Sequence, residues 1–230
     1  MLAILSDVHA NLPALRAVLD HARAIGCRSY LSLGDVTGYG AQPGECIELL
    51  HELGVPNILG NHDRYIVRNE DCSRSRIVSR ILHYQRAMLQ PRHVEWLKAS
   101  LAHFADGDRL FLHGGPQDPV DQYLYEVSRR TIPTGIHQLF AGHTHIQTLA
   151  DFENCSFCNP GSVGQPRDGD WRAAYATLAD NRIELHRVAY DVDQAAAAMR
   201  AAGFEPLYYE NLFKGAQIGG RIDQITVHRE

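Results

Sequence analysis

Short apolar runs recur along the chain, and segments with helical periodicity separate the first three of them. The runs at residues 2–5, 30–33 and 55–59 are short and continuous, which predicts buried β-strands. One helical pattern begins after Asn11 and another begins after Pro43. A βαβαβ order of this kind is typical of a parallel sheet with right-handed crossovers.

The remainder of the chain predicts further helices and strands. Residues 64–103 have a helical period and are rich in arginine, which favours a solvated helical face over a basic rim for an anionic substrate. More strands are predicted at residues 109–112, 138–141, 156–158, about 172–178 and about 182–190. A helix over residues 192–202 follows, and a final strand is indicated near residues 222–227. Residues 116–135 are long for a connection and could form a lid on the substrate side.

Length and composition favour one folded domain. A chain of 230 residues with 45% hydrophobic and 21% charged residues has enough apolar surface for a sizeable core. We therefore predict a single α/β domain over residues 1–230. It would have a helical insertion at about residues 64–103 and a C-terminal helical tail from about residue 192.

Charge and cysteine content exclude several classes of partner. The formal net charge of −5 argues against a broad surface for nucleic acid, and no apolar run approaches the length of a membrane span. Residues 1–5 lack the basic and hydrophobic regions of a signal peptide. The five cysteines are scattered, and Cys155 and Cys158 lack the second pair of a zinc site. We expect a cytoplasmic protein in a reducing compartment, without membrane or nucleic-acid partners; the sequence does not determine whether it forms homo-oligomers.

Residues that can bind metal ions follow directly after several predicted strands. In an open α/β sheet the ligand site lies beyond the carboxyl ends of the strands. The strand-end residues offer two carboxylates, one amide and five imidazoles: Asp7, His9, Asp35, Asn61, His62, His113, His143 and His145. Imidazole with carboxylate suits Mn, Fe, Co or Zn, and the set is too large for one ion. It predicts two ions about 3.5–4 Å apart, bridged by a carboxylate and a hydroxide.

The order of these residues resembles that of the calcineurin-like metallophosphoesterase superfamily. The motifs are Asp7-x-His9, Gly34-Asp35, Gly60-Asn61-His62-Asp63, His113 and Gly142-His143-x-His145. Residues 34–40 and 159–164 resemble a branch of small prokaryotic phosphodiesterases, and the likeness spans roughly residues 1–190. It implies a four-layer αββα sandwich of two mixed β-sheets flanked by helices.

The resemblance also implies a role for each strand-end residue. Three residues and a bridging carboxylate would hold the first metal ion: Asp7, His9, His145 and Asp35. The second ion would share that bridge and bind Asn61, His113 and His143. His62 would protonate the leaving oxygen or stabilise developing charge, with its ring oriented by Asp63. We expect two divalent transition-metal ions, with Mn²⁺ preferred over Fe, Zn, Co or Ni.

These assignments predict dinuclear-metal-dependent hydrolysis of phosphoesters, in which a metal-bridging hydroxide attacks phosphorus in line. Analogy with the branch favours a phosphodiesterase acting on a small or nucleotide-like substrate. Alternatives are a phosphomonoesterase or a protein phosphatase, although the insertion and the lid would narrow the groove that a protein phosphatase needs. A non-catalytic protein-binding scaffold is a hypothesis of another class, and the full set of ligands argues against it.

Three residues near the predicted centre have two interpretations each. Arg167 could bind a substrate phosphate bidentately or belong to a surface turn. Asn11 could face the site, although capping of the following helix is favoured. Tyr39 could stack on a substrate or pack in the core. The other histidines, His93 among them, are predicted to be ordinary surface residues.

Overall fold

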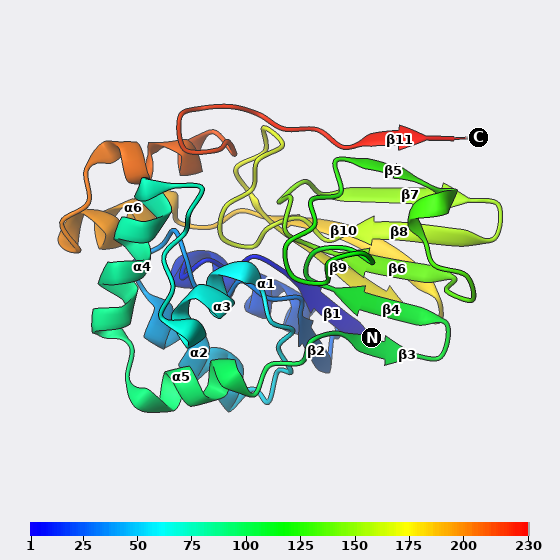
Figure 1. The fold of residues 1–230 in the computed structure, drawn as a ribbon, viewed down its shortest axis with the longest axis horizontal. Helices are drawn as coiled ribbons and strands as arrows, with labels where there is room; N and C mark the ends of the chain where they lie inside the picture. The colour runs from blue at the N-terminus through cyan, green and yellow to red at the C-terminus, as the bar shows by residue number, and fades with distance from the viewer. Residues whose placement is uncertain (230) are drawn as a thin grey trace.

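The computed structural model describes residues 1–229 and contains two mixed β-sheets with helices gathered beside them (Figure 1). The first sheet has the strand order β10-β9-β1-β2. Its strands are β1 (Leu2–Leu5), β2 (Ser29–Ser32), β9 (Ala173–Ala179) and β10 (Arg182–Val188). Strand β1 is parallel to β2 and antiparallel to β9, so the predicted parallel start of the fold is confirmed.

The second sheet has the order β3-β4-β6-β8-β7. Its strands are β3 (Phe104–Asp106), β4 (Arg109–Leu112), β6 (Gln138–Ala141), β7 (Thr148–Phe152) and β8 (Cys155–Asn159). The three central strands β4, β6 and β8 are parallel, whereas β3 and β7 are antiparallel edges. A separate two-stranded ladder joins β5 (Glu126–Ser128) to β11 (Thr226–His228).

The helices fill the βα connections and the insertion. They are α1 (Leu12–Ala24), α2 (Pro43–Glu52), α3 (Asn61–Arg68), α4 (Arg76–Met88), α5 (Pro91–Lys98) and α6 (Val192–Ala201). Three short 3₁₀-helices cover Arg129–Thr131, Pro206–Tyr208 and Glu210–Phe213. No helix within residues 1–229 is both long and apolar enough to cross a membrane.

Apolar side chains fill three layers. Between the sheets, the buried rings of Phe111 and Phe140 stack 4.6 Å apart at 8°. The outer face of the first sheet packs against the helices, with Leu5 and Leu15 in that cluster. The outer face of the second sheet carries Phe157, and its cluster is completed by residues of the β5 and β11 segments. The α/β class with two mixed sheets is confirmed, and here a small ladder takes the place of outer helices.

Two expectations about local structure were wrong. Residues 55–59 form only isolated bridges, Ser32 to Asn57 and Ile58 to Leu101, because Pro56 has no N–H for a regular ladder. In the tail, α6 agrees with the helix predicted over residues 192–202, whereas the final strand β11 lies at Thr226–His228 and not over residues 222–227. The short strands β3, β5 and β7 escaped prediction because none carries a continuous apolar run.

Phe140→Ala tests the packing between the sheets. We expect it to lower the free energy of unfolding by about 3–5 kcal/mol, because it leaves a cavity beside Phe111. Urea unfolding provides the measurement, with Phe213→Ala as the matched control because that ring is exposed. Equal losses in the two variants would show that the intersheet layer does not stabilise the fold.

Candidate metal centre

Sharp turns directly after the strands bring the predicted ligands together. Asp7, His9, Asp35, His143 and His145 all have φ between 49° and 65°. This left-handed region costs non-glycine residues on the order of 1–2 kcal/mol each. Five such residues at strand ends, all buried, mark a functional site, since strain of this kind persists only where the surrounding structure enforces it.

Residues 159–164 supply much of that enforcement. The Asn159 amide donates to Gly142 O and Thr144 Oγ1, both at 2.8 Å, and so holds the turn that carries His143 and His145. Ser162 Oγ donates to Asp7 O at 2.7 Å, and Gly164 N donates to the same carbonyl at 3.0 Å. A side chain at Gly164 would collide with Val8 O, so only glycine allows this approach.

The first ligand cluster contains two histidine rings that face each other. Nδ1 of His9 lies 2.7 Å from Thr37 O, and Nδ1 of His145 lies 2.7 Å from Gln165 O. Because a carbonyl only accepts, each Nδ1 must carry the proton, so in the neutral rings both Nε2 atoms present lone pairs. These Nε2 atoms are 3.0 Å apart, and Asp7 Oδ1 lies 3.2 Å from that of His145. Three acceptors converging in this way form a group that could hold a metal ion.

The second cluster repeats this arrangement with different elements. Nδ1 of His113 donates to Leu33 O at 2.8 Å, which turns Nε2 towards the other ligands. Nε2 lies 3.2 Å from Asn61 Oδ1 and 3.2 Å from His143 Nδ1. Asn61 is the first residue of α3, and the two histidines follow β4 and β6.

Asp35 lies between the two clusters. Its Oδ2 is 3.3 Å from His113 Nε2 and 3.8 Å from His9 Nε2. Its Oδ1 accepts from the His62 backbone N at 2.8 Å, which fixes the carboxylate. Asp35 is therefore placed to touch cations in both clusters.

The electrostatics of the site favour neutral imidazoles around a positive charge. Burial, followed by the charge of a neighbouring residue, lowers the pKa values of His9, His143 and His145, so their lone pairs are available near neutral pH. Burial would also lower the pKa of His113, but the charge of Asp35 and its hydrogen bond to the ring, together with the charge of Asp7 and the Leu33 carbonyl, outweigh burial and raise that pKa to about 9. A proton on His113 or a metal ion beside it would each supply the positive charge that the Asp35 carboxylate favours there.

His62 lies against the first cluster with its ring free of hydrogen-bond partners at Nδ1. The ring is 4.9 Å from that of His9 and 4.8 Å from that of Tyr39. Gly38 makes room for it, because a Cβ there would lie 2.2 Å from His62 Nδ1. Burial lowers the pKa of this imidazole well below its usual range.

The expected hydrogen bond from Asp63 to the His62 ring is not formed. Asp63 Oδ1 instead accepts from the N and Oγ1 of Thr37, both at 2.9 Å. Its Oδ2 accepts from Val36 N and Asn57 Nδ2, both at 3.3 Å. Asp63 points back along its helix to the loop after β2, so it orients Thr37, whose carbonyl in turn fixes His9.

The three candidate substrate contacts differ in their surroundings. Arg167 is not part of a surface turn: it is only 6% exposed, and its guanidinium lies 5.4 Å from the Tyr39 ring. Tyr39 is half-buried between Arg167 and His9. Asn11 caps α1 through Ala14 N, as favoured, and its amide also donates to Gly164 O at 2.8 Å.

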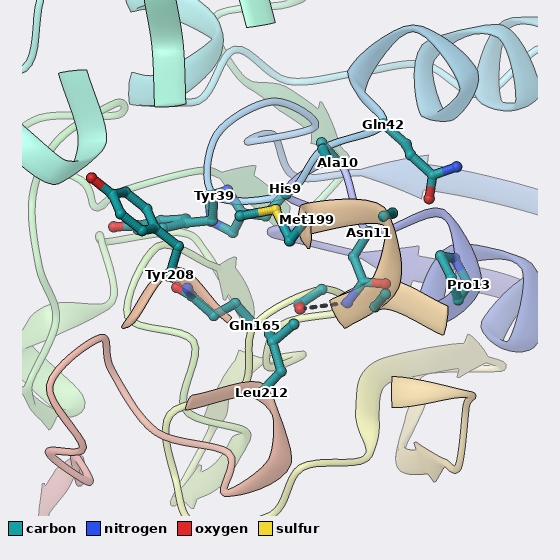
Figure 2. A pocket seen from close by; sticks show the side chains of 15 residues that line it. His9, Ala10, Asn11, Pro13, Tyr39, Gln42, Gln165, Met199, Tyr208 and Leu212 are labelled. Atoms are coloured by element: carbon teal, nitrogen blue, oxygen red, sulfur yellow. Dashed lines mark hydrogen bonds between the residues drawn. The ribbon is translucent and has the colours of Figure 1, made fainter. Parts of the chain in front are cut away.

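Behind this site, the C-terminal segment packs onto the first metal-binding loop. Met199, Tyr208 and Leu212 line one small cavity together with His9 and Asn11, and Figure 2 shows these side chains around it. The cavity among them measures about 20 Å³, room for a water-sized group and no more. The tail therefore supports the ligand loop from behind and leaves no space there for a substrate.

Sequence reasoning missed several residues that hold the site. Gln85 of α4 is fully buried and binds Gly38 N and Gly40 O, both at 2.7 Å. Asp121 accepts from Arg74 at 2.5 Å and lies 3.6 Å from the otherwise unpartnered Nε2 of His143. No local pattern marks either residue, because their partners are distant in sequence. His93, expected at the surface, is buried against Glu48 at 3.0 Å.

The loop that carries Asp121 also covers part of the centre. The Tyr123 ring lies 3.8 Å from the His143 ring. Arg64 of α3 and Arg74 both bind Asp121, so the arginine-rich insertion holds this loop in place. The lid over residues 116–135 stays a prediction, and the structure shows that Tyr123 of this segment contacts His143.

Comparisons with known proteins point to one family. The family model of the calcineurin-like phosphoesterase superfamily domain matches residues 1–181. An uncharacterized protein of Methanocaldococcus jannaschii is 30% identical over 218 residues, covering 85% of this chain and 90% of that protein. The phosphodiesterase YfcE of Escherichia coli is 28% identical over 192 residues, covering 77% and 86%. The crystal structure of a metallophosphoesterase from Sphaerobacter thermophilus aligns with a TM-score of 0.80 at 32% identity, covering 93% of this chain and 99% of that one.

Asp121→Asn tests whether this carboxylate orients His143. The change keeps the shape of the side chain and removes the charge that faces Nε2. We expect the weaker-bound Mn²⁺ to lose about tenfold or more in affinity, because carboxylate partners of metal-binding histidines contribute about 10–100-fold. Calorimetric titration of chelator-treated protein measures this, with the exposed Glu126→Gln on the same segment as control. Unchanged affinity in Asp121→Asn would contradict the assignment.

Proposed function

We propose that this chain, which belongs to the calcineurin-like phosphoesterase superfamily, hydrolyses small or nucleotide-like phosphodiesters at a centre of two metal ions. Membership of the family makes it a metal-dependent phosphoesterase. Beyond this, we propose that two ions bind, that diesters are preferred, and that individual residues have the roles given below. The five free, buried cysteines support a reducing cytoplasmic location.

One observation carries the proposal: two sets of acceptors converge on either side of one carboxylate. The first set comprises Asp7, His9 and His145, and the second comprises Asn61, His113 and His143. Asp35 Oδ2 lies near His9 of the first set and His113 of the second, so this carboxylate would serve an ion held by either set. The nitrogen and oxygen donors suit Mn²⁺, and Fe, Zn, Co or Ni would also fit them.

Two divalent ions bound here would supply a hydroxide at neutral pH and offset the charge of the phosphate. The protein contributes the positions. Asp7 and Asp35 cancel only part of the charge of two such ions, so the centre stays positive and attracts an anionic ester. The strained ligand loops fix the geometry in advance, and the reaction therefore needs little reorganisation.

His62 is the side chain placed to act on the leaving group. Its imidazole lies beside the first cluster, and its backbone N–H holds Asp35 in the bridging orientation. The unpartnered Nδ1 of the ring is available for a hydrogen bond to a substrate oxygen. We assign it the role of donating a proton to the leaving oxygen or stabilising the charge that develops there.

Arg167 is placed to hold the substrate phosphate. It is buried, and its Nη2 donates to Gln165 Oε1 at 3.0 Å, whereas its Nε has no hydrogen-bond partner and no carboxylate within residues 1–229 forms an ion pair with it. A buried cation without a counter-charge is unfavourable by itself, and an anionic substrate would relieve this. Tyr39 supports the guanidinium from one face.

The shape of the site favours small diesters over phosphoproteins. The Tyr123 loop lies over His143, so a long polypeptide would not reach the centre without displacing it. The named activity of the Escherichia coli relative, a phosphodiesterase, supports the diester preference. The presence of every predicted ligand argues against a non-catalytic scaffold.

Hydrolysis of bis(4-nitrophenyl) phosphate and of 4-nitrophenyl phosphate in the presence of Mn²⁺ tests the proposal. We expect turnover of both, faster for the diester. Asp35→Asn should lose at least about a hundredfold in kcat/KM, because it weakens both ion sites together. Absence of Mn²⁺-dependent turnover of either ester, with metal shown to be bound, would contradict the proposal.

Arg167→Met separates substrate binding from stability. We expect kcat/KM for the diester to fall by about a hundredfold, since a charge-assisted contact to the phosphate is lost. The free energy of unfolding should rise by on the order of 1 kcal/mol, because a buried cation without a carboxylate partner opposes folding. Matched kinetic and urea-unfolding measurements decide the point. A loss of stability with unchanged kinetics would instead make Arg167 a structural residue.

A further inference from the structure

We propose that the cleft beside the metal centre binds a planar aromatic group, which makes a nucleotide-sized phosphodiester the substrate class. The proposal rests on the function proposed above and specifies which group the ester carries. The cleft measures about 390 Å³, within the range of about 300–1,000 Å³ typical of small-molecule sites. Its walls include Tyr39, Tyr123, Tyr125, Arg167, Arg221 and Ile77.

Two tyrosines that line the cleft also contact a histidine of each ligand cluster. Tyr39, on one wall, has its ring 4.6 Å from that of His9. Tyr123, on the other wall, has its ring 3.8 Å from that of His143. A group attached to a phosphate at the centre would therefore extend between these two tyrosines.

The tyrosine wall has the geometry of a stacking platform. Tyr123 and Tyr125 are parallel within 3°, with ring centroids 5.5 Å apart. Both rings retain solvent exposure, and that of Tyr123 is 39%. Because the Tyr123 ring already contacts both Tyr125 and His143, the ring available to a base is that of Tyr125. Stacking of a base on an aromatic side chain contributes about 1–3 kcal/mol. Ile77 and Val78 of α4 give the cleft an apolar side that also suits a flat ring.

Arg167 supplies the second half of the recognition. Its buried guanidinium lies in the same cleft and has an unpartnered Nε. A phosphate bound to it would place the attached sugar and base along the tyrosine wall. The cleft therefore offers one buried cation, Arg167, for one phosphate and one aromatic surface for one base.

The charges at the rim argue against a long nucleic acid. Asp121 forms ion pairs with both Arg74 and Arg64, and Asp223 forms one with Arg221 at 2.8 Å, so each of these three arginines has a carboxylate partner. A protein that follows a nucleic-acid backbone needs free cations along its groove. The paired arginines here, together with the net charge of −5, restrict recognition to a single nucleotide unit.

The test compares two ligands that differ only by the base. Adenosine 5′-monophosphate and ribose 5-phosphate are titrated by calorimetry into the Mn²⁺-loaded protein. We expect the nucleotide to bind about tenfold or more tightly, in line with the contribution of stacking. Tyr125→Leu should bring the ratio of the two Kd values close to one, whereas Tyr125→Phe, which keeps the ring, should retain it. Tyr125 is chosen for substitution because its ring stacks on Tyr123, whereas the ring in contact with His143 is that of Tyr123.

Equal Kd values in the unchanged protein, or a ratio that Tyr125→Leu leaves intact, would overturn this inference. Either result could accompany normal hydrolysis of bis(4-nitrophenyl) phosphate, in which case the proposed function stands and only the substrate class is wrong. Preferential binding of the nucleotide without any ester hydrolysis would support the aromatic cleft and contradict the catalytic proposal. The binding and turnover measurements therefore distinguish the two failures.

Discussion

Two backbone carbonyls determine the chemistry of this protein, because they force the rings of His9 and His145 to present lone pairs to each other. Thr37 O and Gln165 O each accept from an Nδ1, which leaves the two Nε2 atoms 3.0 Å apart and adjacent to Asp7. Without a cation this contact is repulsive. Thr37 belongs to the loop that carries Asp35 and Gln165 to the segment after β8, so the tautomers depend on how loops from both sheets pack together. Leu33 O imposes the same constraint on His113 in the second cluster.

The fold provides this constraint through loops that are costly to form. Five left-handed, buried, polar residues oppose folding, and the layers of apolar packing on both faces of the sheets must outweigh that strain. The segment 159–164 and the insertion helices have a similar role on opposite sides. Residues 159–164 tie together the loops that carry Asp7 and His143. The arginine-rich insertion holds Asp121, and with it the loop of Tyr123, next to His143. Arg167 is a buried cation without a carboxylate partner, which lowers the stability of the fold. Binding of an anionic substrate would explain why such a residue is present.

Much of the candidate site could be predicted because every ligand except Asn61 follows shortly after a strand, and strand ends can be recognised from local patterns. The parallel order of β1 and β2 and the hairpin of β9 and β10 followed from the same reasoning. The supporting contacts could not be predicted, since they join residues far apart in sequence. Asp63 is instructive: its neighbour His62 suggested a pair, but at the start of α3 the carboxylate points to Thr37 instead. Gln85 and Asp121 carried no signal at all, because a buried glutamine on a helix and an aspartate in a loop are unremarkable in a sequence.

The central claim is that Asp35 stands between two metal ions. Anomalous X-ray scattering from crystals of the Mn²⁺-loaded protein, recorded at the manganese edge, tests it most directly. The account predicts two peaks about 3.5–4 Å apart, one beside His9 and His145 and the other beside His113 and His143, with Asp35 Oδ2 between them. A single peak at full occupancy, or two peaks that do not share Asp35, would contradict it.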